Sequence, residues 1–292
     1  MKTNKLMKFF SFAMIAGIVL ISSCVDEERI TLQDTQDITE EALTDSYFQD
    51  MDDMAGVAIE TPTDNQYSGG RTATTITIQD DRFKCNGVVV TITPDANSTV
   101  DVPKGVMVAD FGTGCTDLRG NVRTGKLIFT YSGRRFLPGS KLITTTDNYT
   151  INEIKLEGTR TLTNVQTSST SAPRFNVVLS GGKATFTDGT VATRESNITY
   201  EWVRAANPAS DQLVVDQSST ASGKTRAGRS YALTLLKSLK YQRFCGIAVE
   251  GIKKYVIDGG KEITIDYGDG TCDKSVTITV SGGTSRTINV GG

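Results

Sequence analysis

Strand-like alternation runs through the chain from residue 72 onward and constrains its fold more than any other feature. Segments such as TATTITIQ (72–79), GVVVTITP (87–94) and SVTITVSGG (275–283) alternate apolar, mostly β-branched residues with polar ones. This period of two is typical of strands with one buried and one wet face. Asp188-Gly189 and Gly181-Gly182 are hairpin turn signals. We therefore predict one all-β domain of antiparallel meanders, built as a sandwich or as an extended, curved sheet.

One short N-terminal helix is expected before the strands. Within 37–58, Asp37 and Glu40 have the spacing of a capping box. The apolar positions on one helical stripe are Leu43, Tyr47, Met51, Met54 and Ala58. Because this stripe is incomplete, the helix needs the β domain (72–292) to pack against. The segment TPTDNQYSGGR (61–71) then indicates a linker to the strands.

Charge is distributed unevenly along the chain. Residues 25–60 contain twelve acids and a single base, Arg29, so their formal charge is −11, whereas residues 61–292 carry a formal charge of +6. Such an acidic block is typical of a solvated or interacting tail. We therefore interpret residues 24–71 as an acidic tether. The modest positive charge of the body gives no reason to expect nucleic acid as a partner.

The first 24 residues have the features of a bacterial lipoprotein signal. MKTNKLMK supplies three lysines without an acid, and the apolar run that follows is too short to span a bilayer comfortably. Residues 1–23 are therefore expected to be a cleaved signal peptide. The run ends in Ile21-Ser22-Ser23-Cys24, which resembles the lipobox of bacterial lipoproteins. That resemblance implies acylation of Cys24, and more than one acyl chain gives stable membrane anchoring.

An unusual phrase occurs twice, as DFGTGCTD at 110–117 and as DYGDGTCD at 266–273. Similar residues precede each copy, so we predict a degenerate repeat over 85–131 and 245–290. The glycines of the phrase fit a tight reversal of the chain that needs positive φ. The phrase is therefore expected to form a corner between two strands.

Cysteine usage agrees with the repeat. If Cys24 carries lipid, four cysteines remain, and a secreted address favours disulfide bonds. Three pairings are possible for four cysteines. The repeat favours Cys85–Cys115 and Cys245–Cys272, because each copy then closes on itself in the same way.

Three acids of the second corner, Asp266, Asp269 and Asp273, have some character of a calcium loop. Calcium takes about six to eight oxygen ligands, however. The first copy also has Thr113 where the second has Asp269. A structural corner explains the phrase without an ion, so we predict neither a metal site nor a cofactor.

The composition excludes the most common catalytic machinery. The chain contains no histidine, which removes Ser-His-Asp and Cys-His activation. It also lacks the phosphate-binding and dinucleotide-binding fingerprints. Glu153 and Glu157 would lie ~13 Å apart on one strand, which is too far for the paired carboxyls of a glycosidase. We therefore predict a protein without enzymatic activity.

Two groups of side chains are possible contact residues for a ligand. Tyr200 and Trp202 share one strand face with other apolar residues, a pattern typical of core positions. Arg134, Arg135 and Phe136, in the segment SGRRFLPGS, are the better candidates because a hairpin loop exposes them.

The acids directly after Cys24, in VDEER (25–29), resemble the signal that sends lipoproteins of Bacteroidetes-type bacteria to the cell surface, and a plain solvated spacer is the alternative. With its Thr-rich β body and D-aromatic-G-x-G corners, the chain resembles surface lipoproteins of such bacteria, a group that implies no particular activity. The resemblance implies a lipid-anchored, surface-exposed outer-membrane protein with a binding, structural or adhesive role toward a glycan or a surface protein. The alternative is a carbohydrate-active enzyme or a glycan-binding accessory lipoprotein.

Replacing Cys24 with Ser is expected to release the protein from the membrane, because the residue that carries the acyl chains is lost. Cell fractionation followed by immunoblotting compares the Cys24→Ser variant with the unaltered chain. Full retention of the variant in the membrane fraction contradicts lipidation at this residue.

Overall fold

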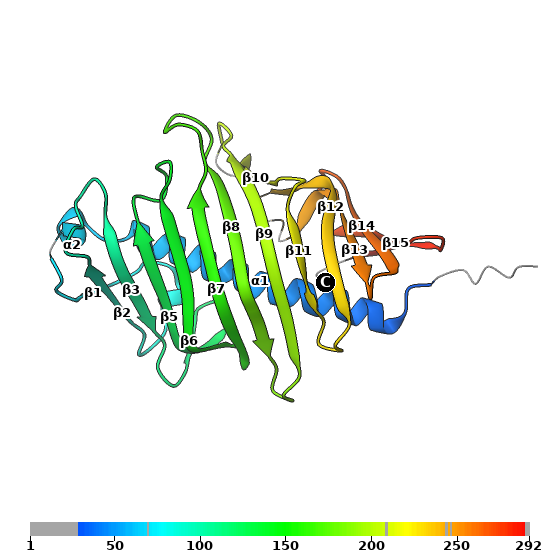
Figure 1. Cartoon of the computed structure of the whole chain (residues 1–292), viewed down its shortest axis with the longest axis horizontal. Helices are drawn as coiled ribbons and strands as arrows, with labels where there is room; N and C mark the ends of the chain where they lie inside the picture. The colour runs from blue at the N-terminus through cyan, green and yellow to red at the C-terminus, as the bar shows by residue number, and fades with distance from the viewer. Residues whose placement is uncertain (1–28, 69, 208–209, 243–244, 246, 290–292) are drawn as a thin grey trace, which may run out of the picture.

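One antiparallel sheet forms the body of the protein (Figure 1). The computed structural model describes residues 29–289 apart from 69, 208–209, 243–244 and 246. In this part of the chain sixteen strands join edge to edge in a single sheet, accompanied by one long helix. The all-β prediction with an N-terminal helix is therefore confirmed, and the sheet has the extended, curved form.

The elements fall into two groups along the chain. The first group comprises α1 (Leu32–Glu60), α2 (Asp64–Ser68), β1 (Thr74–Ile76), a 3₁₀ turn (Asp81–Phe83), β2 (Val89–Pro94), β3 (Lys104–Asp110), β4 (Cys115–Thr116), β5 (Val122–Ser132), β6 (Lys141–Ile151), β7 (Ile154–Asn164) and β8 (Arg174–Thr185). The second comprises β9 (Val191–Val203), β10 (Gln212–Val215), β11 (Thr220–Lys224), β12 (Ser230–Gln242), β13 (Ala248–Ile257), β14 (Lys261–Asp269), β15 (Ser275–Val280) and β16 (Ser285–Asn289).

Neighbours in the sheet follow the order of the chain almost throughout. The path runs from β1 to β16, with β4 paired to β5 at the side. Strands β10 and β11 together fill one position between β9 and β12, because β10 pairs with 200–203 of β9 and β11 with 193–197. This is the meander that short hairpin connections produce.

The helix α1 is longer than the predicted 37–58. Its N-cap is Thr31, whose hydroxyl accepts a hydrogen bond from the Asp34 amide at 3.1 Å. The Asp34 carboxylate in turn accepts one from the Thr31 amide at 2.8 Å. The capping box therefore lies at Thr31 and Asp34, and not at Asp37 and Glu40 as predicted. The helix thus begins about one and a half turns earlier than the predicted box requires.

The helix crosses the strands along the length of the sheet (Figure 1). Its own residues Phe48, Met51 and Met54 are buried on the face toward the sheet. The helix packs most closely on β5, β6 and β7. Leu43 of the predicted stripe is 38 % exposed, so the buried face is rotated from the expected one. The predicted linker contains α2, whose Tyr67 is buried.

Several acidic residues of α1 face the sheet and are shielded from solvent. Asp34 and Asp37 are 1 % and 2 % exposed, and each lies 3.0 Å from a guanidinium nitrogen of Arg229. Glu41 pairs with Arg194, and both side chains are buried. The segment 24–71 that we interpreted as an acidic tether, either solvated or interacting, is therefore a docked helix over 32–60.

Four arginines supply the matching positive charge, and we call them the arginine ladder. Arg123, Arg160 and Arg194 are buried in strands, and Arg229, whose side chain is 23 % exposed, lies just before β12. Arg160 Nε lies 2.8 Å from Asp52 Oδ1, and Arg123 Nη2 lies 2.8 Å from Asp50 Oδ2. Arg194 on β9 pairs with Glu41, and Arg229 pairs with Asp34 and Asp37, so beyond β7 later parts of the sheet meet earlier turns of the helix. A buried ion left without its partner costs several kcal/mol, so these pairs fix where the helix can lie.

Two hydrophobic clusters make up the core. The first lies between α1 and the strands from β1 to β9, and the second lies among β10 to β16. Tyr200, near the end of β9, packs against both clusters. The sheet therefore behaves as one body, in which this tyrosine and α1 join the two halves.

Both predicted disulfide bonds are present. The Cα atoms of Cys85 and Cys115 are 5.5 Å apart, and those of Cys245 and Cys272 are 5.7 Å apart. Each bridge joins a cysteine a few residues before a hairpin, β2–β3 or β13–β14, to a cysteine a few residues after it. In the chain-entropy account a bridge over a loop of this length stabilises the fold by roughly 3–4 kcal/mol.

The repeated phrase makes the same aspartate-to-glycine hydrogen bond in both copies. The Asp110 carboxylate accepts a hydrogen bond from the Gly112 amide at 2.9 Å, and Asp266 accepts one from Gly268 at 2.9 Å. Gly112 and Gly268 have φ of 60° and 89°, a region that favours glycine. The first copy leaves β3 in a turn, whereas the second lies within β14, where its pairing with β13 shifts register. Each copy is closed by its disulfide bond, and we call each a stapled corner; the two lie toward opposite ends of the sheet.

Breaking the buried pair of Arg160 and Asp52 is expected to destabilise the fold by about 3–5 kcal/mol, because Arg160→Ala leaves a buried carboxylate unpaired. The double variant Arg160→Ala/Asp52→Ala should lose less than the sum of the two single variants. Urea denaturation measures each free energy of unfolding. The control Lys155→Ala removes a half-exposed pair with Glu157 and should cost about 0–1 kcal/mol. Equal losses for Arg160→Ala and Lys155→Ala would contradict the role of the ladder.

The docking of α1 is expected to weaken in acid through Asp34. Burial alone would raise the pKa of Asp34, but hydrogen bonds from Lys261, Thr31 and Arg229 together lower it from 3.8 to about 2. Because the folded-state pKa lies below the unfolded one, this carboxylate stabilises the fold above a pH of about 4, and its contribution is lost as the pH falls toward about 2.

Thermal denaturation over this pH range should show a flatter pH dependence for Asp34→Asn than for the unaltered chain. The exposed Asp101 provides a matched control, because Asp101→Asn leaves the helix contacts intact. Parallel curves for Asp34→Asn and the unaltered chain would contradict the assignment.

Candidate functional site

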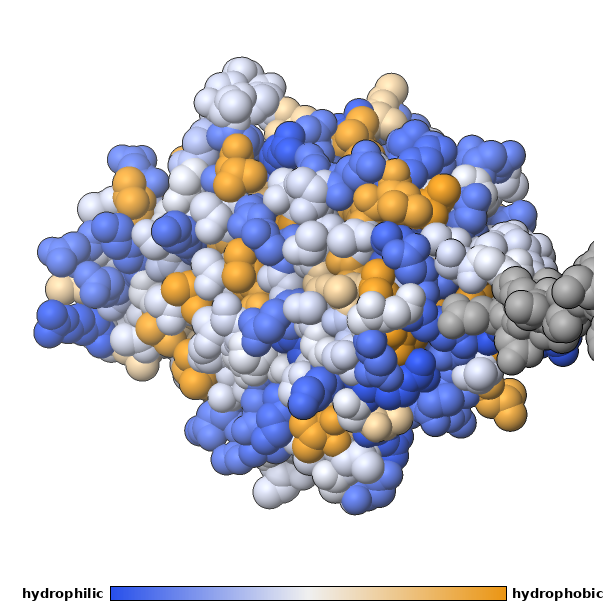
Figure 2. Space-filling view, turned by 45° about the vertical axis from the view of Figure 1, so that its right-hand side comes forward, coloured by the Kyte–Doolittle hydropathy of each residue, from blue (hydrophilic) through white to orange (hydrophobic). Residues whose placement is uncertain are grey.

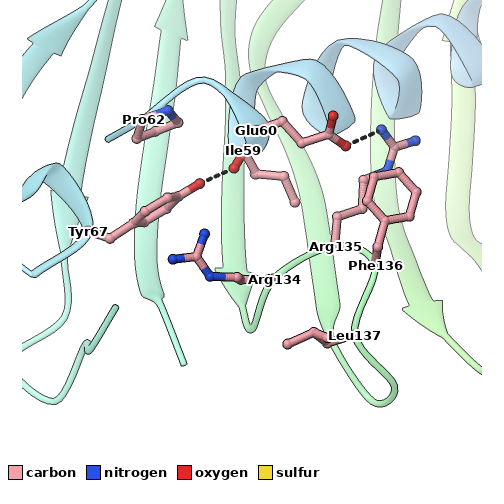
Figure 3. Close-up of a pocket in the computed structure, with 8 residues that line it drawn as sticks. All are labelled: Ile59, Glu60, Pro62, Tyr67, Arg134, Arg135, Phe136 and Leu137. Atoms are coloured by element: carbon pink, nitrogen blue, oxygen red, sulfur yellow. Dashed lines mark hydrogen bonds and ion pairs between the residues drawn. The ribbon is translucent and has the colours of Figure 1, made fainter. Parts of the chain in front are cut away.

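A pocket of about 300 Å³ lies where the C-terminal end of α1, the short helix α2 and the loop between β5 and β6 meet (Figure 3). The residues that line it are Ile59, Glu60, Pro62, Tyr67, Arg134, Arg135, Phe136 and Leu137. Arg134, Arg135 and Phe136 are the contact residues that the sequence selected, and the fold brings all three to this pocket. The volume is at the lower end of the range for small-molecule sites.

Side chains that follow the loop in sequence donate hydrogen bonds to its backbone carbonyls. The side-chain amide of Asn164 donates to the Arg135 carbonyl at 2.9 Å, and that of Gln166 donates to the Phe136 carbonyl at 2.9 Å. The Ser140 hydroxyl also donates to the Arg135 carbonyl. The loop is therefore fixed in place by its neighbours, unlike a plain solvated hairpin.

Arg134 crosses the pocket toward α2. Its Nη2 lies 2.8 Å from Asp64 Oδ1, and its Nε donates to the Val100 carbonyl at 3.1 Å. The guanidinium lies 5.9 Å from the centre of the Tyr67 ring. Tyr67 donates its hydroxyl to the Ile59 carbonyl at the end of α1, and burial raises the pKa of Tyr67. This phenol therefore ties α2 to α1 and stays protonated.

Arg135 lines the opposite wall of the pocket. Its Nη1 lies 2.9 Å from Glu60 Oε1, and its guanidinium lies 5.3 Å from the ring centre of Phe136 and 5.7 Å from that of Phe175. The side chain is 17 % exposed, and its Nε is buried without a hydrogen-bond partner. One donor of this arginine is thus unused by the protein.

Aromatic rings continue from the pocket to the end of β9. The Phe136 ring lies 6.0 Å from Phe175 and 5.9 Å from Trp202 between centres. Arg204 lies over both Phe136 and Trp202, at 5.8 and 5.2 Å. Tyr200 and Trp202 were predicted to be core residues. Tyr200 does pack on the core, but both rings are only half-buried.

Sequence reasoning missed two walls of the pocket. Glu60 is the last residue of the acidic helix, and Tyr67 lies in the segment predicted to be a linker. Neither residue is marked as a site residue by its type or by its spacing from other residues in the sequence. A tyrosine inside an otherwise polar linker was the only available signal for Tyr67.

Two carboxylates outside this pocket, Asp216 and Glu157, have lowered pKa values, which opposes general acid chemistry. Glu201 and Asp216 line a pocket of about 160 Å³, but hydrogen bonds from the amide and hydroxyl of Ser218 lower the pKa of Asp216. A hydrogen bond from Lys183 likewise lowers the pKa of Glu157. A carboxylic acid that protonates a leaving group needs a raised pKa.

The three acids considered for calcium line a separate hollow of about 150 Å³ at the second corner. Asp266 accepts from the Gly268 amide, Asp269 from the amide and hydroxyl of Thr271, and Asp273 from the Ser275 amide. Hydrogen bonds from Thr271 lower the pKa of Asp269. Within the described part of the chain, no three His, Cys, Asp or Glu side chains are grouped so that they could hold a metal ion.

Comparison with family models, with curated proteins and with solved structures finds no match to this chain. The lipidation predicted at Cys24 lies outside the described residues. Among the residues that are described, no helix is both long enough and apolar enough to cross a bilayer.

Proposed function

We propose that this protein is a lipid-anchored, non-enzymatic binding protein of the outer cell surface, and that its pocket at Arg134–Leu137 receives the ligand. Two observations support the proposal: Cys24 ends a lipobox-like segment that would anchor the chain to a membrane, and the pocket lies at the end of α1 remote from the start of that helix.

The geometry of α1 carries this proposal. The helix begins eight residues after Cys24, and the pocket lies at its other end (Figures 1 and 3). A helix of 29 residues is about 43 Å long at about 1.5 Å per residue. A lipid on Cys24 would hold the first turn close to the bilayer and leave the pocket about 40 Å farther along the molecule.

The connection between the start of α1 and the pocket is stiff. Ion pairs hold α1 on the sheet from its first turn to Asp52, and the pair of Glu60 with Arg135 holds its end. The loop that forms the pocket belongs to this same sheet. Helix and pocket would therefore move together, as display of a binding site requires.

We propose no enzymatic activity because of the side-chain types that the chain and the pocket contain. The chain has no histidine, and the pocket itself is lined by a single carboxylate, Glu60, which is paired with Arg135. The carboxylates Asp216 and Asp269, in two other hollows of the surface, have lowered pKa values. These features favour binding over hydrolysis.

Surface labelling tests the proposal. Leu137, at the pocket, is 42 % exposed, so Leu137→Cys should react with a membrane-impermeant maleimide as fully on intact cells as after lysis. In the variant Cys24→Ser/Leu137→Cys the label should no longer be cell-associated. Val177→Cys, at a buried position, is the control for denatured protein. Labelling of Leu137→Cys only after lysis would contradict a surface-exposed pocket.

A further inference from the structure

The charged groups around the pocket are balanced in pairs. Arg134 pairs with Asp64 at 2.8 Å and Arg135 with Glu60 at 2.9 Å. All four side chains keep some exposure to solvent. An anionic ligand would approach the two carboxylates as well as the arginines, and a cationic ligand would meet the arginines. A ligand without net charge avoids both repulsions.

The same four groups offer donors and acceptors side by side. Guanidinium groups only donate hydrogen bonds, and ionised carboxylates only accept them. The ligand must therefore both accept and donate, at neighbouring positions. Adjacent hydroxyl groups of a sugar do this, because each hydroxyl carries one donor and two acceptor lone pairs.

Apolar surface completes the pocket. Ile59 projects between the two arginines, Phe136 lies beside the Arg135 guanidinium (Figure 3), and Leu137 lies at the rim. The C–H face of a pyranose ring packs on such surface while its hydroxyls point to the polar wall. At about 300 Å³ the pocket has room for one ring. Phe136 also contacts Trp202, so a second ring of the same chain could reach that indole.

We infer that the pocket binds one uncharged pyranose unit of a larger glycan. This inference rests on the proposed binding function and gives it a ligand class. Arg134 and Arg135 donate to sugar hydroxyls, Glu60 accepts from them, and Phe136 packs against the ring.

A glycan microarray with the full chain in detergent micelles tests the inference. The array carries neutral glycans, glycans that contain uronic acids and glycans that contain amino sugars with a free, cationic amino group. We expect binding to at least one neutral glycan, which titration calorimetry then quantifies. Phe136→Ala and Arg134→Gln should each weaken binding about tenfold or more. Variants are compared only where their melting temperatures match that of the unaltered chain.

Two further variants separate the pocket from the rest of the surface. A Cβ atom at Gly56 would lie 2.4 Å from Arg135 Nη1, so Gly56→Ala displaces that guanidinium without changing a lining residue. It should weaken binding as well. Arg286→Ala, in the exposed strand β16, is the matched control and should leave binding unchanged.

Neutral glycan binding that survives Phe136→Ala, Arg134→Gln and Gly56→Ala would overturn the inference, because the sugar then lies elsewhere. Binding confined to acidic or amino sugars and lost in these variants would overturn the neutral class while leaving the proposed binding function standing. Failure to bind any glycan on the array also overturns the inference. The proposed surface display is read separately by the labelling at Leu137.

Discussion

Buried arginines in the sheet need buried carboxylates as partners, and these ion pairs determine where α1 lies on the sheet. Arg160 and Arg194 lie on β7 and β9, two strands apart and therefore about 10 Å from each other across the sheet. Their partners Asp52 and Asp45 are seven residues apart on α1, which is also about 10 Å along a helix. A helix that crosses the strands can satisfy both only because these two spacings agree.

The same constraint explains the uneven charge of the chain. The acidic block is not spread over a solvated tail, because several of its members, including Asp34, Asp37 and Glu41, are partners for Arg229 and Arg194. An open sheet of this length has no second sheet to cover its helix-facing side, so the helix does so. The two stapled corners stiffen the strands toward each end, and the edge strands β1 and β16 are short, which limits pairing with other chains.

What the sequence could predict was local. Alternation gave the strands, and the repeated phrase gave both disulfides and the Asp110 and Asp266 turns, because all of these depend on residues close together in the chain. The expected turn at Gly181-Gly182 was wrong: both residues lie within β8, where the pairing register shifts. The irregular pairing uses the glycines that a hairpin turn would also use.

The contacts that sequence reasoning missed span long distances. Asp52 and Arg160 are 108 residues apart, and nothing in either neighbourhood marks the other as its partner. The candidate pocket likewise combines a local part, which could be predicted, with a long-range part, which could not. Its loop, Arg134 to Phe136, was selected as an exposed polar and aromatic segment, whereas Glu60 and Tyr67 reach it only through the docking of α1 and α2.

Hydrogen exchange of the α1 amides is the most direct measurement of whether ion pairs make this helix part of the body. If α1 is clamped along its length, amides from about residue 36 to 60 in the native protein should exchange with an opening free energy close to that of the buried strands β5 to β9. Protection should fall in Arg160→Ala across the whole helix. Exchange of α1 that is orders of magnitude faster than that of the strands, in the unaltered chain, would show that the helix is an independent tether.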